Sequence, residues 1–177
     1  MSEIVKLISL PERIMGKKST KENKNIYQLS REEQGLTREQ ASELMETVSA
    51  DRIDKIEREV SLPHTDEVLA MAKAYKNPHL CNYFCSNECP IGQEYVPEVS
   101  VKDLSNIVLE VLANLNSVEK EKNRLIEIAA DGQITEDEYS DFSIIKNKLE
   151  QISMSVNALK LWVDKTIADG KIDKNFE

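Results

Sequence analysis

Apolar side chains recur every three or four residues through most of the chain, the spacing that places them on one face of an α-helix. Runs of β-branched residues with a period of two, which would indicate strands, are scarce. The pattern therefore predicts an all-α fold. Pro90, Gly92 and Pro97 interrupt the helical spacing and separate short helical segments from longer ones that follow.

Two short helices joined by a tight turn are expected between residues 26 and 45. The apolar positions of the first are Ile26, Tyr27 and Leu29. Gly35 ends this helix, because glycine readily takes the left-handed conformation that closes a helix. Thr37 and Gln40 have the spacing of a capping box, so the second helix begins at about Arg38.

A third short helix follows the second after a few residues. Ser49 is its candidate N-cap, and Ile53 and Ile56 form its apolar stripe. The outward positions of this helix are then Ala50, Asp51, Arg52, Asp54 and Lys55. These outward residues form a polar face through which the helix can contact another molecule.

Residues 26–77 resemble the XRE-like, lambda-repressor-type helix-turn-helix domains of bacteria and phages. The motifs that carry the resemblance are Gly35-Leu36-Thr37, Ile53-x-x-Ile56-Glu57-Arg58, and the Leu62-Pro63 turn before the apolar segment Val68-Leu69-Ala70-Met71-Ala72. The family usually has a glycine in the turn before the third helix, whereas Met45-Glu46-Thr47-Val48-Ser49 contains none.

The resemblance implies a sequence-specific DNA-binding transcriptional regulator whose third helix enters the major groove of double-stranded DNA. By position in the family, Thr37 and Arg38 would hold phosphate at the start of the second helix. The residues at the start of the third helix would face base edges. The expected DNA-binding residues are Thr37, Arg38, Ser49, Ala50, Asp51, Arg52 and Lys55.

Charge bears on this interpretation, because a DNA-binding face is normally basic. The chain has a net charge of −9, and residues 51–59 contain three basic and four acidic side chains. Phosphate contacts are therefore expected from Arg38 and from an N-terminal arm, residues 1–24, which contains Lys17, Lys18, Lys21 and Lys24. The acidic third helix leaves an alternative open, in which the helix-turn-helix is vestigial and the protein is an interaction adaptor.

We expect four segments: the arm at 1–24, the helix-turn-helix domain at 25–90, a linker at 91–99 and an acidic helical hairpin at 100–177. Two stretches of alternating four- and three-residue spacing predict the long helices of the hairpin. Their apolar positions are Leu104, Val108, Val111, Leu115, Val118 and Leu125 in the first, and Phe142, Ile145, Leu149, Ile152, Val156, Leu159 and Val163 in the second. Residues 100–103 and the box Thr135 to Glu138 supply the helix starts.

The hairpin contains more apolar surface than two helices cover between themselves. We therefore expect a homodimer in which two hairpins form a four-helix bundle, which would also hold two DNA-reading helices at a defined spacing. A monomer whose core is satisfied within the chain is the alternative. The hairpin would dimerise the protein in the first case, and in either case it could receive a signal.

All three cysteines, Cys81, Cys85 and Cys89, fall within nine residues, with His79 just before them. Such clustering raises the possibility of a zinc site, an iron–sulfur cluster or redox-sensing thiols. Cys81 and Cys85 stand one turn apart on a helix, but Cys89 joins them only if the helix ends after Cys85. The alternative is that the three are small buried residues without a cofactor.

Other functional classes find no support in the sequence. Glycine-rich phosphate loops and nucleophile motifs are absent, so we expect no enzyme. The sequence has no apolar run long enough for a membrane span, and its first residues do not have the pattern of a signal peptide. We therefore expect a cytoplasmic protein that does not bind membranes.

Overall fold

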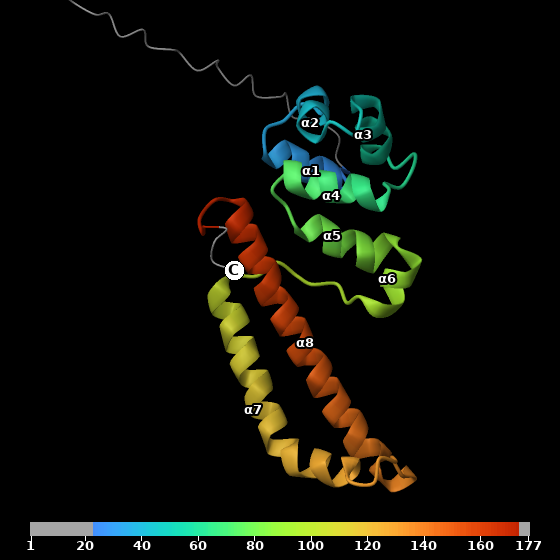
Figure 1. Cartoon of the computed structure of the whole chain (residues 1–177), viewed down its shortest axis with the longest axis vertical. Coiled ribbons are helices and arrows are strands. Elements are labelled where there is room, and N and C mark those ends of the chain that lie inside the picture. Colours follow the sequence, from blue (N-terminus) through green and yellow to red (C-terminus); the bar gives the residue numbers. More distant parts are fainter. Residues whose placement is uncertain (1–22, 174–177) are drawn as a thin grey trace, which may run out of the picture. The chain divides into compact units, whose positions relative to one another are not determined.

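The structure is a computed structural model of the chain, and it describes residues 23–173. Within this range it contains helices and no strand, which confirms the predicted all-α class (Figure 1). The chain divides into two compact units between Ser61 and Leu62. No helix in the described range is long and apolar enough to cross a bilayer.

The first unit contains three short helices, as the spacing predicts. They are α1 (Ile26–Glu33), α2 (Arg38–Met45) and α3 (Ala50–Glu57). The Asn25 side chain caps α1 by accepting a hydrogen bond from the backbone N–H of Gln28 at 3.0 Å. Gly35, which follows α1, has φ +67°, the left-handed conformation expected of it.

The core of this unit is small and aliphatic apart from one tyrosine. Its buried apolar residues are Tyr27, Leu36, Ala41, Met45, Val48, Ile53 and Ile56. One predicted core position is wrong, since the Leu29 side chain is 46 % exposed. Instead α1 buries the polar residues Gln28, Ser30 and Arg31, of which Arg31 donates to the Glu57 carboxylate of the third helix and Gln28 donates to Glu32.

The turn between α2 and α3 lacks the glycine that is usual in the family. Glu46 ends α2 with φ 58° and ψ −34°, so it takes the left-handed conformation in glycine's place. A side chain in this conformation costs roughly 1–2 kcal/mol. Burial of Met45 and Val48 on either side of the turn offsets that cost and holds the two helices together.

The second unit begins with four short helical segments: α4 (Thr65–Ala74), α5 (His79–Tyr83), the π-helix η1 (Phe84–Glu88) and α6 (Pro90–Tyr95). The predicted linker at 91–99 is therefore helical in its first half, because proline is favourable in the first turn of a helix. Gly92 of α6 lies against η1 so closely that a Cβ would stand 1.9 Å from the Cys85 carbonyl oxygen. This contact requires a glycine.

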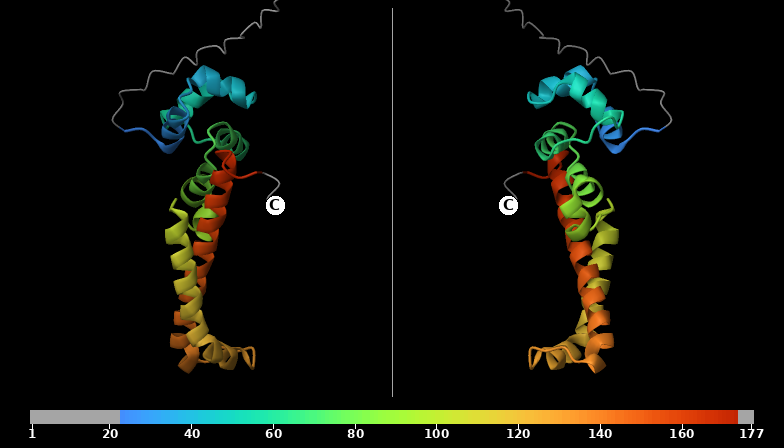
Figure 2. Two further views of the ribbon diagram at one scale, coloured as in Figure 1. Left: turned by 90° about the vertical axis from the view of Figure 1, so that its left-hand side faces the viewer. Right: turned by 90° about the vertical axis from the view of Figure 1, so that its right-hand side faces the viewer.

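The remainder of the second unit is the helical hairpin. Helices α7 (Leu104–Ala129) and α8 (Tyr139–Ala168) run antiparallel side by side, joined through the 3₁₀ turn η2 (Glu136–Glu138) (Figures 1 and 2). Asp103 caps α7 by accepting from the Asn106 N–H at 3.0 Å. Thr135 and Glu138 form the predicted capping box before α8.

The packing line is the row of side chains through which α7 and α8 contact each other, and it differs from the predicted one. On α7 it runs through Ile107, Val111, Asn114, Val118, Glu121, Leu125 and Ile128, which are buried or half-buried. The predicted positions Leu104, Val108 and Leu115 are 38–50 % exposed, as are Leu149 and Val156 of α8 at 45 and 51 %. The prediction placed apolar side chains on the packing line, but polar residues occupy part of it.

A compact cluster anchors the segment that precedes α7 onto the hairpin. Val99 packs with Ile107, Ala158 and Leu161, and all four are less than 10 % exposed. His79 Nε2 donates to the Val99 carbonyl oxygen at 3.1 Å, and the Asn82 side chain accepts from the Val99 N–H at 2.8 Å. The segment after α6 is thus fixed by both apolar and polar contacts.

Candidate nucleic-acid interface

The outward face of α3 is where the family places its base contacts. Asp51 and Lys55 have side chains that are 76 and 50 % exposed and pair with each other at 2.7 Å. Ala50 and Arg52 are half-buried, and Arg52 Nη1 donates to the Ser61 hydroxyl. The first turn and a half of α3 therefore presents a short side chain, an acid and two cations.

The two predicted N-caps are both present, Thr37 at the start of α2 and Ser49 at the start of α3. Thr37 Oγ1 accepts from the Gln40 N–H at 3.1 Å, and Gln40 Oε1 accepts from the Thr37 N–H at 2.9 Å, which completes the capping box. Ser49 Oγ accepts from the Arg52 N–H at 3.2 Å. Each hydroxyl uses its oxygen as a cap, and the hydrogen of the Ser49 hydroxyl can still donate to a phosphate, whereas the Thr37 hydroxyl donates to Glu39.

A carboxylate stands at the N-terminus of α2, where the resemblance expects a phosphate. Hydrogen bonds from its own backbone N–H and from Thr37 hold the pKa of the exposed Glu39 side chain below its usual value. The same helix end that would attract phosphate therefore already attracts a negative side chain. Glu39 reduces the positive potential that DNA would meet there.

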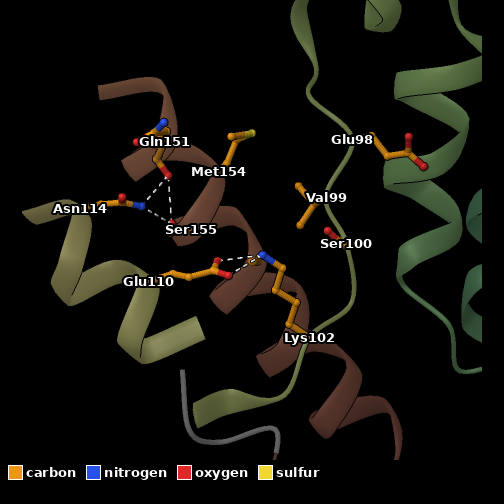
Figure 3. A pocket seen from close by; sticks show the side chains of 10 residues that line it. Glu98, Val99, Ser100, Lys102, Glu110, Asn114, Gln151, Met154 and Ser155 are labelled. Carbon is orange, nitrogen blue, oxygen red and sulfur yellow. Dashed lines mark hydrogen bonds and ion pairs between the residues drawn. The ribbon is translucent and has the colours of Figure 1, made fainter. Parts of the chain in front are cut away.

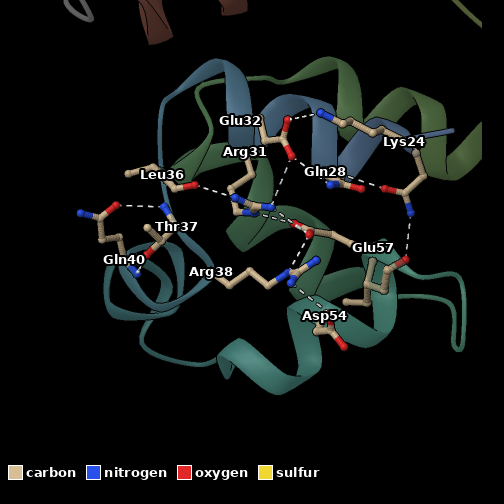
Figure 4. A network of polar contacts seen from close by, with 12 residues as sticks. Lys24, Gln28, Arg31, Glu32, Leu36, Thr37, Arg38, Gln40, Asp54 and Glu57 are labelled. Carbon is tan, nitrogen blue, oxygen red and sulfur yellow. Dashed lines mark hydrogen bonds and ion pairs between the residues drawn. The ribbon is translucent and has the colours of Figure 1, made fainter. Parts of the chain in front are cut away.

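The main polar feature of the unit is a buried network around Glu57, the last residue of α3 (Figure 4). Arg31 of α1 donates to Glu57 through Nε at 2.5 Å and Nη2 at 2.9 Å. Arg38 of α2 donates to the same carboxylate at 2.8 Å. Because Glu57 is 1 % exposed, this one side chain links all three helices in the interior of the unit.

The sequence indicates that Glu57 is buried, although the charge count of residues 51–59 treated it as an exposed acid. Glu57 lies one residue after Ile56 and four after Ile53, on the buried face of α3, and Arg31 lies four residues after the buried Tyr27. Removing Glu57 from the exposed residues leaves three basic and three acidic side chains in residues 51–59. The outward face of α3 is therefore neutral rather than negative.

Arg38 has a different set of contacts from the phosphate expected of it. Besides Glu57, its guanidinium pairs with Asp54 at 3.1 Å, and its side chain is 34 % exposed. A phosphate contact from Arg38 would thus compete with two carboxylates. Its role in DNA binding stays a prediction.

A helix-turn-helix family model matches residues 29–79 of the chain. Residues 29–79 are a helix-turn-helix domain. The match includes α4, so the domain extends beyond the division at Ser61 and contains the XRE-type motifs named above. Searches of curated proteins and of solved structures found no match. The match to the helix-turn-helix family is thus the finding from these comparisons that bears on function.

The basic residues expected to assist the helix-turn-helix domain lie mostly outside the described residues. Lys17, Lys18 and Lys21 belong to that part of the arm. Lys24 is described, and its ammonium pairs with Glu32 at 2.7 Å within the first unit. The contribution of the arm to phosphate binding remains a prediction.

The cysteines do not gather into a metal site. All three are half-buried free thiols, and the helical chain continues through η1 rather than ending after Cys85. His79 contacts Val99 instead of a thiol. Among residues 23–173, no group of three Cys, His, Asp or Glu side chains could hold a metal ion, so the structure does not support the zinc or iron–sulfur alternative.

Cys81 is also expected to be a slow nucleophile. Burial raises the pKa of its thiol, with the neighbouring Cys85 and Asp164 acting in the same direction. Less thiolate is then present near neutral pH, so alkylation of Cys81 by iodoacetamide should be slower than that of free cysteine. Mass spectrometry of the labelled peptide in native protein and in urea measures the difference. Faster labelling than free cysteine would favour redox-sensing thiols.

The hairpin holds a cavity of about 290 Å³ beneath the segment that precedes α7 (Figure 3). Lys102 Nζ pairs with both Glu110 carboxylate oxygens at 2.7 and 2.8 Å. Asn114 Nδ2 donates to the Ser155 hydroxyl at 2.8 Å on the opposite wall. The polar groups of the cavity bind one another, and the Lys102 to Glu110 pair fastens this segment to α7.

Proposed function

We propose that the chain is a sequence-specific DNA-binding transcriptional regulator of the XRE type, which binds paired half-sites as a dimer. The observation that carries the proposal is the outward face of α3, which begins at a capped N-terminus and lies within a matched helix-turn-helix domain. Helices of this kind read base edges with their N-terminal residues. A regulator of this type acts on cytoplasmic DNA, and that localisation is part of the proposal.

Roles follow from the exposure of each side chain. Lys55 is the exposed cation on the face and can donate to guanine or phosphate, while Asp51 can accept from a cytosine amino group. Ala50 offers a small apolar contact, such as a thymine methyl group prefers. Arg52 also faces base edges, while Thr37 and Arg38 at the start of α2 and Ser49 at the start of α3 supply phosphate contacts, together with the N-terminal arm.

The Glu57 network supports the proposal because it fixes the angle of α3. Base readout requires side chains to be held in one register against the groove, and mobile helices lose that register. Arg31 and Arg38 hold the C-terminal end of α3 while Ser49 caps the other end. The helix is therefore held at both ends by these contacts.

Charge reversal at Lys55 tests DNA binding directly. Lys55→Glu should weaken binding at least about tenfold, because it removes one base or phosphate contact and adds a repulsive charge. The probe is a double-stranded DNA selected from a random library by the wild-type protein, followed by fluorescence anisotropy at two salt concentrations. The weaker binding should be accompanied by a smaller salt dependence.

Lys171→Glu is the matched control, since Lys171 is an exposed lysine beyond α8 that is also paired with an acid, Asp169. It makes the same change in net charge, so its affinity should stay within about twofold of wild type if only the α3 face binds DNA. Equal affinity of the two variants, or failure of the library to yield any bound sequence, would favour the interaction adaptor.

A further inference from the structure

A second cavity of the second unit lies between α5, α8 and the segment that follows α6, and its volume is about 250 Å³. Val96, Pro97, Val99 and Leu161 form an apolar wall of this cavity. Val99 and Leu161 also belong to the buried cluster that anchors the segment, so this part of the wall is continuous with the core. An apolar wall of this kind is typical of a site for a small molecule.

Hydrogen bonds within the chain hold the wall of the cavity in place. Asn82 Nδ2 donates to the Pro97 carbonyl oxygen at 3.0 Å, and Asn82 Oδ1 accepts from the Val99 N–H at 2.8 Å. His79 contacts the Val99 carbonyl oxygen at 3.1 Å. Because these bonds already fix the wall, a bound molecule would not have to order it, and the affinity is higher for that reason.

Two opposite charges on α8, Lys160 and Asp164, line the same cavity. The next lysine and aspartate with this order and spacing on α8 are Lys165 and Asp169, which form an ion pair at 3.0 Å. Lys160 and Asp164 have no hydrogen-bond or ion-pair partner among residues 23–173. Both charges are therefore available to a molecule in the cavity.

The pair of charges selects a class of ligand. A neutral apolar molecule would take Lys160 and Asp164 out of water without giving them a partner, which is unfavourable. A molecule with two like charges would pair with one of these residues and be repelled by the other. A zwitterion pairs with both. Side chains four residues apart on a helix are about 5–6 Å apart at Cβ, so the two charges of a small zwitterion can reach both of them.

The volume of the cavity sets the size of this zwitterion. Water takes up about 30 Å³ per molecule in the liquid, so the cavity has room for a molecule of roughly eight to ten non-hydrogen atoms. Amino acids with a branched aliphatic side chain, such as valine and leucine, have this size. They carry both charges, and their side chains can contact the apolar wall.

We propose that the cavity binds a small zwitterion, an α-amino acid with an aliphatic side chain. The carboxylate of the amino acid accepts from Lys160 Nζ and from the Asn157 amide, which lines the cavity three residues earlier on α8. The ammonium group donates to Asp164. The aliphatic side chain packs against Val99 and Leu161.

This cavity lies next to the end of the helix-turn-helix match. The match ends at His79, the first residue of α5, and Pro78 and Cys81 on either side of it line the cavity. Helix α8 also contacts the end of α4, since Lys165 Nζ donates to the Lys76 carbonyl oxygen at 2.9 Å. An amino acid in the cavity would therefore join α8 to the segment that follows α4. Its role as an effector rests on the proposed function, whereas its binding does not.

Isothermal titration calorimetry of the full chain without DNA tests the binding, with L-valine, L-leucine and L-isoleucine as probes. At least one of them should bind. Its analogues that lack the carboxylate or the ammonium group should bind at least about tenfold more weakly, because each leaves one charge without a partner. No heat from any probe at about 10 mM, a concentration at which even a weak specific site is occupied, would overturn the inference. Equally strong binding of the analogues would overturn it too.

Lys160→Met and Asp164→Asn test whether the two charges form the site. Each variant should bind the amino acid at least about tenfold more weakly than wild type, with an unchanged circular dichroism spectrum. Lys146→Met is the matched control, because Lys146 is an exposed lysine on the same helix that does not line the cavity. If both cavity variants bind as tightly as this control, the proposed site is wrong.

Alkylation of cysteines tests the location of the ligand. Cys81 lines the cavity, whereas Cys89 does not. At about ten times the dissociation constant, the amino acid should slow the labelling of Cys81 by iodoacetamide about tenfold, because only the unliganded fraction reacts, and leave Cys89 unchanged. Unchanged labelling of Cys81 would contradict the inference. None of these tests involves DNA, so their failure is distinguishable from a failure of the Lys55→Glu experiment.

Discussion

Replacing Glu57 by glutamine is expected to destabilise the first unit by about 3–5 kcal/mol, because removing one partner of a buried ion pair is strongly destabilising. The Arg31 side chain is 8 % exposed and makes two hydrogen bonds to Glu57. Arg31 also donates through Nη1 to the Leu36 carbonyl oxygen and lies 4.0 Å from the Glu32 carboxylate, a longer ion pair than those to Glu57. Since domains of this size have about 5–15 kcal/mol in total, the loss would leave the unit close to unfolding.

Hydrogen exchange followed by mass spectrometry measures this effect separately in each unit. Peptides from α1 to α3 should lose most of their protection in Glu57→Gln, while peptides from the hairpin should keep theirs. Glu43→Gln is the control, because Glu43 is an exposed acid on α2. A network without energetic importance would leave the two variants equally protected.

Replacing Ile107 by alanine should cost about 2–5 kcal/mol, the range for removing a buried Ile side chain and leaving a cavity. Ile107 is fully buried and lies among Val99, Ala158 and Leu161. Its loss removes the contact that ties the segment before α7 to both helices of the hairpin. The second unit should therefore unfold at a lower denaturant concentration.

The chain's only tryptophan, Trp162, packs against this cluster, so its fluorescence reports on the hairpin. The midpoint of the urea transition should fall in Ile107→Ala and stay unchanged in Leu109→Ala, whose side chain is 65 % exposed. Each protein should be compared at one concentration, since a dimer makes the midpoint concentration-dependent. Equal midpoints for the two variants would show that the cluster does not hold the hairpin together.

Local chemistry was predictable from the sequence wherever a few adjacent residues decide the outcome. The capping box at Thr37 and Gln40, the cap at Ser49 and the left-handed Gly35 all lie within one helical turn of what they bind. Their hydrogen bonds depend on spacing along the chain, which the sequence displays. The order of α1, α2 and α3 follows from these signals, whereas α5, η1 and α6 were not predicted.

The packing of the hairpin was predictable only in part. Alternating three- and four-residue spacing indicates a helix with an apolar face, but α7 has two candidate lines one residue apart. The structure packs the line that contains Asn114 and Glu121, because Ser155 and Lys148 of α8 meet them there. Which line is buried depends on residues 27 and 41 positions away, and no local pattern contains that information.

By itself the sequence determined the all-α class, the helix starts and ends, and the helix-turn-helix resemblance, because each depends on short-range hydrogen bonding and periodicity. Only the tertiary structure decided that Glu57 is buried between Arg31 and Arg38 and that Val108 and Val156 are exposed. Whether a charge is paired or an apolar side chain is covered depends on contacts between distant segments. Because Glu57 is buried by those contacts, the outward face of the third helix is neutral although the helix as a whole is acidic. The contacts between α7 and α8 likewise leave one set of apolar side chains exposed on the hairpin.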